Sequence, residues 1–216
     1  MESTINAGDT AWVLIATALV TMMTPALGFF YGGMVRRKNI LSTLNLSFIT
    51  MGIIAIQWVL IGYTLAFGPS LGGLIGRLDF LGLKGIGLEP NADYSATIPA
   101  LAFMAFQGTF AVITPALITG AFVERVSFKV YLLFALLWAT LVYDPLAHTV
   151  WGVGGMLREL GALDFAGGTV VHIAAGFSAL AFAFAIRPRR GYGRIPIEPH
   201  NIPLTVLGAG LLWVGW

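Results

Sequence analysis

Long apolar runs separated by short polar segments dominate the hydropathy pattern of this chain. Five runs reach the roughly 20 residues that an α-helix needs to cross a bilayer, and a sixth is shorter. The runs cover residues 11–35, 40–67, 95–123, 130–150, 165–186 and 202–216. The pattern predicts an all-α membrane protein with five complete spans and part of a sixth.

The sixth run stops before it is long enough to cross a membrane. Residues 204–216 would extend only about 20 Å at the helical rise per residue. We therefore expect residues 1–216 to be a single transmembrane domain fragment of a longer protein.

Composition agrees with a membrane protein. Hydrophobic residues form 57% of the chain and charged residues 10%, whereas soluble domains carry about a quarter charged residues. Cysteine is absent, which excludes disulfides, thiolate catalysis and cysteine-bound metals. The sequence pI of about 9.1 does not indicate nucleic-acid binding, because the few basic residues lie in short runs between the apolar segments.

The basic residues predict the orientation. With an N-terminus outside the cell, the inner loops hold nine lysines and arginines and the outer segments hold three. The inner nine are Arg36, Arg37, Lys38, Arg125, Lys129, Arg187, Arg189, Arg190 and Arg194; the outer three are Arg77, Lys84 and Arg158. This positive-inside bias predicts a multi-pass plasma-membrane protein with its N-terminus outside, and it argues against dual topology.

Small residues recur within the spans. Gly28 and Gly32 form a GxxxG pair, and Ala175, Ala179 and Ala183 repeat every fourth residue. Such stripes let helix backbones approach closely, so we interpret them as packing surfaces. The long outer loop, residues 68–94, has turn chemistry without periodicity, and we assign it no function.

His172 is an imidazole within the fifth run. It lies about 12 Å along the helix from Asp164 by helical rise, near mid-membrane. A neutral imidazole can guide a small polar solute or relay a proton. The alternative is a histidine hydrogen-bonded between helices. A zinc site is not expected, since no second ligand lies at a suitable spacing.

Asp164 opens the fifth run at the position of a helix N-cap. Its carboxylate would accept from the backbone N–H of Ala166 or Gly167. A shielded carboxylate near a pore entrance would also favour cations electrostatically. Both interpretations remain open, and both can hold together.

Aromatic residues near the outer surface raise the possibility of a cation vestibule. Phe106 and Phe110 lie four residues apart beside Gln107, and Trp151 lies at the outer end of the fourth run. Aromatic faces attract cations at short range. Aromatic belts at membrane interfaces are common, however, and are the competing interpretation.

The other ionisable residues invite structural interpretations. Asp144, before Pro145, would cap a helix after a proline break or pair locally, and His148 would lie near the interface. Glu124 and Arg125 would form a structural ion pair, and His200 has no catalytic partner. No Ser/His/Asp constellation, phosphate loop or metal-ligand cluster is visible, so we expect neither an enzyme nor a resident cofactor.

Several segments resemble the ammonium transporter family, the prokaryotic relatives of Rhesus proteins. They occur in family order across almost the whole chain. The strongest is DFAGGTVVH at 164–172, followed by Ala175-Gly176; the others are GFFYGGMVRRKN at 28–39, FQGTF at 106–110, AHTVWG at 147–152 and PHNIP at 199–203. The chain resembles the N-terminal half of an archaeal or bacterial-type ammonium channel.

The resemblance implies roles for five residues. Trp151 and Phe110 would line an outer ammonium site, supported by Asp164. Phe106 would be a gating phenylalanine, with Phe110 just outside it, and His172 would be the first of two pore histidines. Ammonium would lose a proton near the gate, and ammonia would cross an apolar pore. Such a pore disfavours potassium because stripping its water is costly.

The resemblance also implies an assembly and partners. The family fold has two inverted five-helix repeats and an eleventh helix, with the pore between the repeats. This chain would supply the first repeat and the start of the sixth helix. The family forms homotrimers in membrane lipid, and a PII-type regulatory protein would dock on the cytoplasmic face. The alternatives are an ammonium sensor on the same fold and a non-conducting truncated fragment. Methylammonium is the expected transport analogue.

Overall fold

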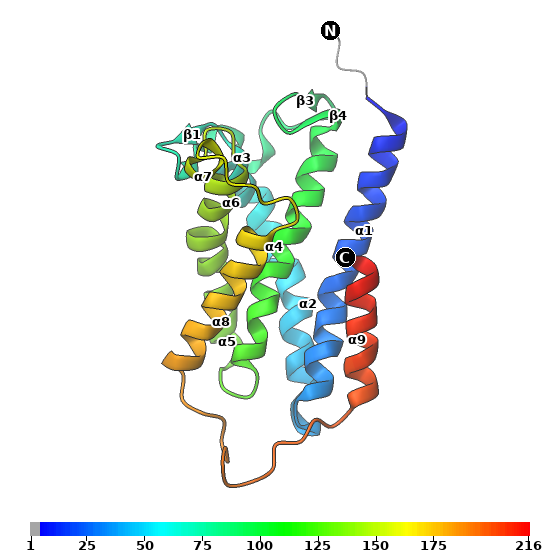
Figure 1. The fold of residues 1–216 in the computed structure, drawn as a ribbon, viewed down its shortest axis with the longest axis vertical. Helices are drawn as coiled ribbons and strands as arrows, with labels where there is room; N and C mark the ends of the chain where they lie inside the picture. Colours follow the sequence, from blue (N-terminus) through cyan, green and yellow to red (C-terminus); the bar gives the residue numbers. More distant parts are fainter. Residues whose placement is uncertain (1–4) are drawn as a thin grey trace.

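The computed structural model describes residues 5–216 as a bundle of long helices with loops gathered at its two ends (Figure 1). In chain order the helices are α1 (Ala7–Met34), η1 (Arg37–Asn39), α2 (Ile40–Gln57), η2 (Trp58–Gly62), α3 (Tyr63–Phe67), η3 (Leu78–Leu83), α4 (Ala100–Phe122), α5 (Phe128–Trp138), η4 (Ala139–Tyr143), α6 (Asp144–Trp151), α7 (Met156–Glu159), η5 (Gly168–Ile173), α8 (Ala174–Ala185) and α9 (Ile202–Gly215). The all-α fold expected from the sequence is confirmed.

Several of these helices join end to end into longer spans. Among residues 5–216, five spans are long and apolar enough to cross a membrane. They are Ala7–Met34, Arg37–Phe67, Ala100–Phe122, Phe128–Glu159 and Gly168–Ala185. Three contain a π-helical turn: η2, η4 and η5. Such turns often mark functional sites within helices.

The third apolar run is part strand. Residues 95–99 form β4 (Ser95–Pro99), which pairs antiparallel with β3 (Pro90–Asn91), and helix α4 begins only at Ala100. Pro99 explains the boundary, because proline disfavours helical backbone in the residue before it. A second hairpin joins β1 (Ser70–Leu71) to β2 (Ile75–Gly76).

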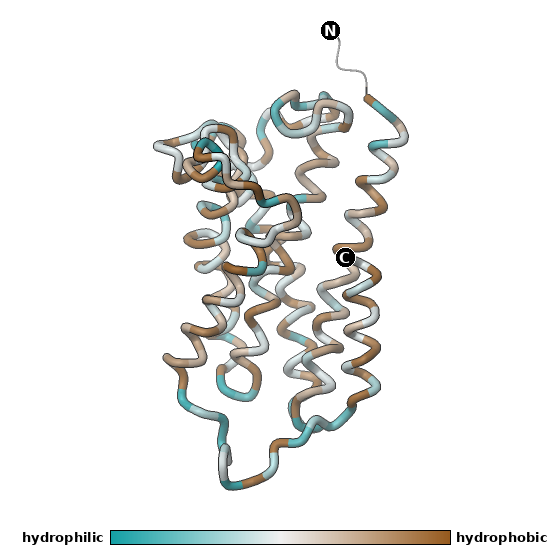
Figure 2. The backbone as a smooth tube through the Cα atoms, viewed as in Figure 1, coloured by the Kyte–Doolittle hydropathy of each residue, from teal (hydrophilic) through white to brown (hydrophobic). Residues whose placement is uncertain are grey.

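The two ends of the bundle differ in character. The β-hairpins, η3 and α7 gather at one end, which we call the hairpin end. The other end, the basic end, holds η1, the turn at residues 123–127 and the segment of residues 186–201, which crosses below the bundle from α8 to α9 (Figure 1). Hydrophilic residues concentrate at both ends, and hydrophobic ones line the helices between them (Figure 2).

Small residues bring α1 close to its neighbours. A Cβ added at Gly28 would lie 3.3 Å from Ser47 Cβ, and one at Gly32 would lie 3.5 Å from Leu44 Cδ2, both on α2. On α9, a Cβ at Gly208 would meet Phe30 N at 2.4 Å. The interpretation of the GxxxG pair as a packing surface is confirmed, and α1 also approaches α9 closely.

Candidate functional site

A hollow of about 300 Å³ opens at the hairpin end, and we call it the aromatic hollow. Its walls are mainly aromatic, with acidic, basic and amide side chains among them. The aromatic members are Phe67, Tyr94, Phe103, Phe106, Phe110, Trp151 and Phe165, and the polar ones are Asp93, Gln107, Arg158 and Asp164. The sequence-predicted aromatic group and Asp164 therefore meet in one place.

Trp151, the last residue of α6, is fixed by hydrogen bonds at both its ring and its backbone. Its indole Nε1 donates to the backbone carbonyl of Asp164 at 2.8 Å, and its own carbonyl accepts from Arg158 Nη1 at 2.7 Å. Because the indole N–H is engaged, the face of the ring is the part left to interact with a cation.

Asp164 caps the helical segment that carries His172. Its Oδ2 accepts from the backbone N–H of Thr169 at 2.8 Å and of Val170 at 3.0 Å. The expected donors, Ala166 and Gly167, were wrong, because Gly167 adopts a left-handed conformation with φ +78° and delays the start of η5. The capping interpretation is right in kind, and the negative charge is held at a helix N-terminus, which favours it.

The order in depth of Phe106 and Phe110 is the reverse of the expected one. Their rings meet edge to face with centroids 5.0 Å apart. Helix α4 runs from the hairpin end to the basic end, so Phe106 lies nearer the opening and Phe110 deeper. The expectation that Phe110 lies outside Phe106 was therefore wrong. It neglected the direction of the helix, which follows from the outer loop before it.

A second pocket of about 280 Å³ lies beneath the aromatic hollow, and we call it the histidine pocket. Phe110 and Ala166 line both spaces, so they form the partition between them. Phe106 lines only the aromatic hollow. The remaining walls of the histidine pocket are apolar apart from His172; they include Ile113, Val171 and Trp216.

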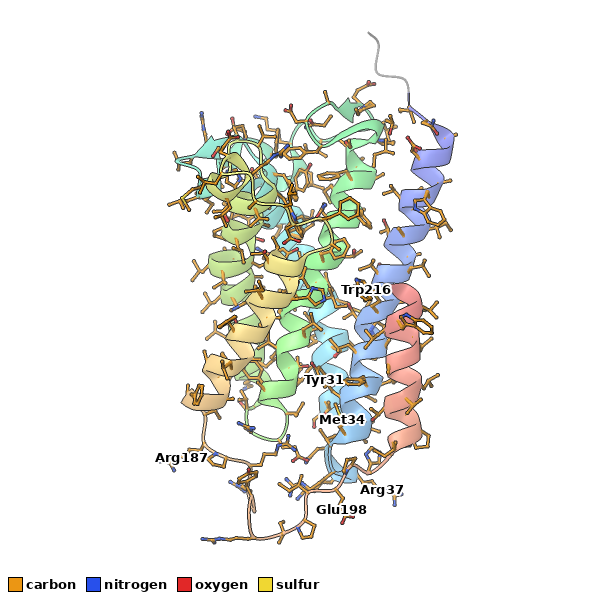
Figure 3. All side chains as sticks on the ribbon, in the orientation of Figure 1. Tyr31, Met34, Arg37, Arg187, Glu198 and Trp216 are labelled. Carbon is orange, nitrogen blue, oxygen red and sulfur yellow. The ribbon has the colours of Figure 1, made fainter. Side chains whose placement is uncertain are left out.

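His172 lies on η5 at about mid-height of the bundle, and the residue is exposed. Its ring centroid is 6.5 Å from that of Trp216, which stands at mid-height (Figure 3). Nδ1 lies 3.1 Å from the Gly167 carbonyl. A carbonyl only accepts, so Nδ1 carries the proton and Nε2 keeps a lone pair in the neutral ring.

Asp144 and His148 are fully buried, which the sequence did not predict. Asp144 makes no capping bond; its Oδ2 accepts from Gln57 Nε2 at 2.7 Å, across to α2. The loops of the hairpin end cover His148, so it is shielded from its surroundings. Its Nδ1 donates to the Ala66 carbonyl at 3.0 Å, and Nε2 lies 2.9 Å from Ser70 Oγ.

At the basic end, Glu124 joins three segments. Its Oε1 accepts from Arg36 Nε at 3.1 Å and from Asn39 Nδ2 at 2.6 Å, and its Oε2 lies 3.8 Å from Arg189 Nη1. Arg36 and Arg189, rather than the expected Arg125, are therefore its ion-pair partners. Burial opposes the charge on Glu124, but hydrogen bonds from Arg36 and Asn39 outweigh it and hold the carboxyl pKa below its usual value.

Sequence reasoning missed several residues of the aromatic hollow, among them Tyr94 and Arg158. Tyr94, in the long loop to which we assigned no function, accepts from Val153 N at 2.7 Å. Arg158 Cζ lies 5.9 Å from the centre of the Tyr94 ring. Loop residues far apart in the chain show no periodicity, so only charge and aromaticity near the predicted vestibule could have drawn attention to them.

Comparison with known proteins assigns the family. The model of the Ammonium Transporter Family matches residues 11–216. The chain is 53% identical to an ammonium transporter from Bacillus subtilis over 97% of its own length and 50% of that protein. The crystal structure of the G343C mutant of Candida albicans Mep2 superposes with a TM-score of 0.89 at 35% identity, covering 99% of this chain and 47% of that one.

A structure described as a sensor Amt protein is also similar, with a TM-score of 0.87 and 31% identity, over 96% of this chain and 52% of that one. This chain thus spans about half the length of the relatives it matches. On the extent and identity of these matches, the chain belongs to the ammonium transporter family.

Proposed function

We propose that this chain forms the first half of a protein that carries ammonium across the plasma membrane, with the hairpin end outside. The observation that carries this proposal is the pair of spaces separated by Phe110: an aromatic hollow beside a carboxylate, then an apolar pocket with one histidine. A cation is favoured in the first, and only a neutral molecule crosses the second at low cost.

The depth order of the residues assigns their roles. Phe106, Trp151 and Asp164 form the recruiting site, in which ring faces and a fixed negative charge attract ammonium. Phe110 is the partition, so it takes the gating role that the sequence had assigned to Phe106. His172 Nε2 offers a lone pair in the pocket beyond, to accept the proton or to guide ammonia.

The family membership supports the wider setting of this proposal. The basic end faces the cytoplasm, as the positive-inside rule requires. A homotrimer with one pore in each subunit, and docking of a PII-type protein on the basic end, are the corresponding proposals for the whole protein.

The test is methylammonium uptake by proteoliposomes containing the full-length protein. We expect Phe106→Ala to raise the methylammonium concentration for half-maximal uptake, because it removes a face of the recruiting site. Phe110→Ala opens the partition and is expected to admit potassium. The reverse pattern, with the potassium leak in Phe106→Ala, would restore the original depth assignment and contradict ours.

Phe48→Ala is the matched control. Phe48 lies on α2 with 47% of its surface exposed and lines neither space. The same truncation there is expected to leave affinity and selectivity unchanged. A comparable change in the control would show that the effect comes from membrane packing rather than from the two spaces.

A sensor is the second function, favoured by the similarity to the sensor Amt protein. A sensor would bind ammonium at the same recruiting site and signal without net flux. Methylammonium binding in detergent, combined with absence of uptake in proteoliposomes, would decide for the sensor. Uptake by the wild-type protein decides for the transporter.

A further inference from the structure

The hairpin of β1 and β2 packs against the turn that follows Trp151 (Figure 1). The hydroxyl of Ser70 on β1 lies 3.0 Å from the Gly154 carbonyl. The Met156 N–H donates to the Gly73 carbonyl at 2.8 Å. A Cβ added at Gly154 would lie 2.9 Å from Ser70 Cβ. We assigned no function to this loop from the sequence, yet its backbone lies directly against the segment that begins at Trp151.

Ser70 also contacts His148, which is fully buried among residues 5–216. His148 Nδ1 donates to the Ala66 carbonyl at 3.0 Å, so in the neutral ring Nε2 is an acceptor, 2.9 Å from Ser70 Oγ. The hydroxyl has one proton for two acceptors, His148 Nε2 and the Gly154 carbonyl, and it accepts the Gly73 N–H at 3.2 Å. One hydroxyl therefore joins the hairpin, helix α6 and the turn after it.

Trp151 lies between the two points that Ser70 contacts. His148 precedes it on α6 by about one helical turn, and Gly154 follows it by three residues. The bond from the indole to the Asp164 carbonyl holds one edge of the ring. The backbone that carries the ring is held from both sides through Ser70, so the position of the ring depends on this hydroxyl.

The hydroxyl acts at a distance from the two spaces. Ser70, His148 and Gly154 line neither the aromatic hollow nor the histidine pocket, whereas Trp151 lines the hollow alone. A cation is attracted to a ring within about 6 Å of its centre. A displaced Trp151 ring would therefore weaken the binding of a cation and leave its later passage unchanged.

We propose that Ser70 is a positioning residue for the recruiting site, and that it holds the face of Trp151 where ammonium binds. This inference rests on the proposed function, because it assumes that the aromatic hollow receives ammonium. It gives the β1–β2 hairpin a role in affinity. The Ser70 hydroxyl and the buried imidazole of His148 transmit the position of the hairpin to Trp151.

The experiment is methylammonium uptake by proteoliposomes containing full-length Ser70→Ala, which removes the hydroxyl and keeps Cβ. The methylammonium concentration for half-maximal uptake is expected to rise about threefold to tenfold, the range of a weakened cation–ring contact. The maximal rate per folded protein is expected to stay near wild type. Amide hydrogen exchange in detergent should become faster at residues 152–156, which is a readout without transport.

His148→Asn is the second variant, and it grades the effect. The asparagine amide keeps a donor for the Ala66 carbonyl and loses the acceptor for Ser70. The Ser70 proton then remains available to the Gly154 carbonyl, so we expect a smaller rise in the half-maximal concentration than in Ser70→Ala. A larger rise than in Ser70→Ala would show that His148 acts by another route and would overturn the proposed transmission.

Ser178→Ala is the matched control. Ser178 on α8 accepts from Trp138 Nε1 at 2.9 Å and lines neither space. Its truncation removes a hydrogen bond of similar length from a buried partner, and it is expected to leave the half-maximal concentration unchanged. An equal rise in this control would indicate general loosening of the bundle and would overturn the proposal. An unchanged value in folded Ser70→Ala, or a lower maximal rate with unchanged affinity, would also overturn it.

Methylammonium binding in detergent separates this proposal from the transport function. A wild-type protein that binds methylammonium without uptake contradicts transport, and Ser70→Ala is still expected to bind more weakly. Equal binding by wild type and Ser70→Ala overturns the role of Ser70 and leaves transport standing. Absence of binding to wild type contradicts the recruiting site and this inference with it.

Discussion

Asp164 and Asp144 are two carboxylates of the same bundle in contrasting surroundings. Asp164 lines the aromatic hollow and accepts two backbone N–H bonds from the start of η5. Asp144 is fully buried in the bundle, where Oδ2 accepts from Gln57 and Oδ1 has no partner among residues 5–216. Asp164 is bonded by backbone groups beside an open space, and Asp144 is bonded at one oxygen by a side chain in the interior.

The contrast separates a carboxylate that we propose for the recruiting site from a polar group that joins two helices. Backbone donors fix the Asp164 carboxylate at the start of η5, where it lines the aromatic hollow. Asp144 joins the fourth span to α2 through Gln57, next to the π-helical turns η2 and η4. Both residues interrupt or border apolar runs, and only their neighbours distinguish the two roles.

Asp164→Ala in the full-length protein is the variant with the largest expected effect on the difference between the two carboxylates. We expect methylammonium uptake to fall by about tenfold or more, because the recruiting site loses its negative charge. The variant also leaves the Thr169 and Val170 N–H groups without their cap, which costs about 1–2 kcal/mol of stability. Uptake normalised to folded protein checks the first effect, and thermal unfolding in detergent checks the second. Normal uptake from folded variant would remove Asp164 from the site.

Asp144→Ala is expected to act on stability rather than on uptake. It leaves one N–H of the buried Gln57 amide without its acceptor, at a cost of about 1–3 kcal/mol, while the other keeps Thr140 Oγ1 at 3.1 Å. Thermal unfolding in detergent measures the loss, while uptake per folded protein stays near wild type. Loss of uptake in well-folded Asp144→Ala would show that Asp144 also serves transport, which contradicts the structural role that we assign to it.

Gly167→Ala tests the hydrogen bonds of Asp164 without changing the carboxylate itself. Gly167 has φ +78°, and an added Cβ would lie 2.8 Å from Val171 Cγ2. The strained backbone costs about 1–2 kcal/mol and shifts the N–H groups that Asp164 caps. We expect a partial loss of uptake together with lower thermal stability. Gly52→Ala, with open space around its Cβ on α2 and outside both spaces, is the control and should change neither.

A third carboxylate, Glu124, is expected to make the stability of the protein depend on pH. Its folded-state pKa is lowered, so its contribution to stability is present above its usual pKa and is lost as pH falls through the folded value. The stability difference between wild type and Glu124→Gln is therefore expected to shrink between about pH 6 and about pH 3. Thermal unfolding across that range measures it. A constant difference would mean that the Glu124 carboxylate contributes no charge-dependent stability.

The contrast also shows what the sequence could predict. The length of the apolar runs predicted the five spans, because a helix needs about 20 apolar residues to cross the hydrocarbon of a bilayer. The turn-like Asp-Phe-Ala-Gly-Gly segment predicted that Asp164 caps a helix. The capped residues were missed, since the left-handed Gly167 shifts the start of η5 and no pattern in the sequence reports it.

Contacts between distant segments were beyond reach from a single sequence. Gln57 and Asp144 lie in different spans, and the pairing of Glu124 with Arg36 joins positions 88 residues apart. The burial of His148 was missed because hydropathy does not reveal loops that fold back over a helix. The depth order of Phe106 and Phe110, by contrast, follows from helix direction and could have been predicted.

Methylammonium uptake by paired isosteric variants of the full-length protein decides between the two carboxylates most directly. Asp164→Asn and Asp144→Asn each replace one oxygen and keep an acceptor for the existing hydrogen bonds. We predict that Asp164→Asn loses most of the uptake while Asp144→Asn retains it, at equal amounts of folded protein. Equal uptake by the two variants, or a larger loss in Asp144→Asn, would contradict the assignment of the cation site to Asp164.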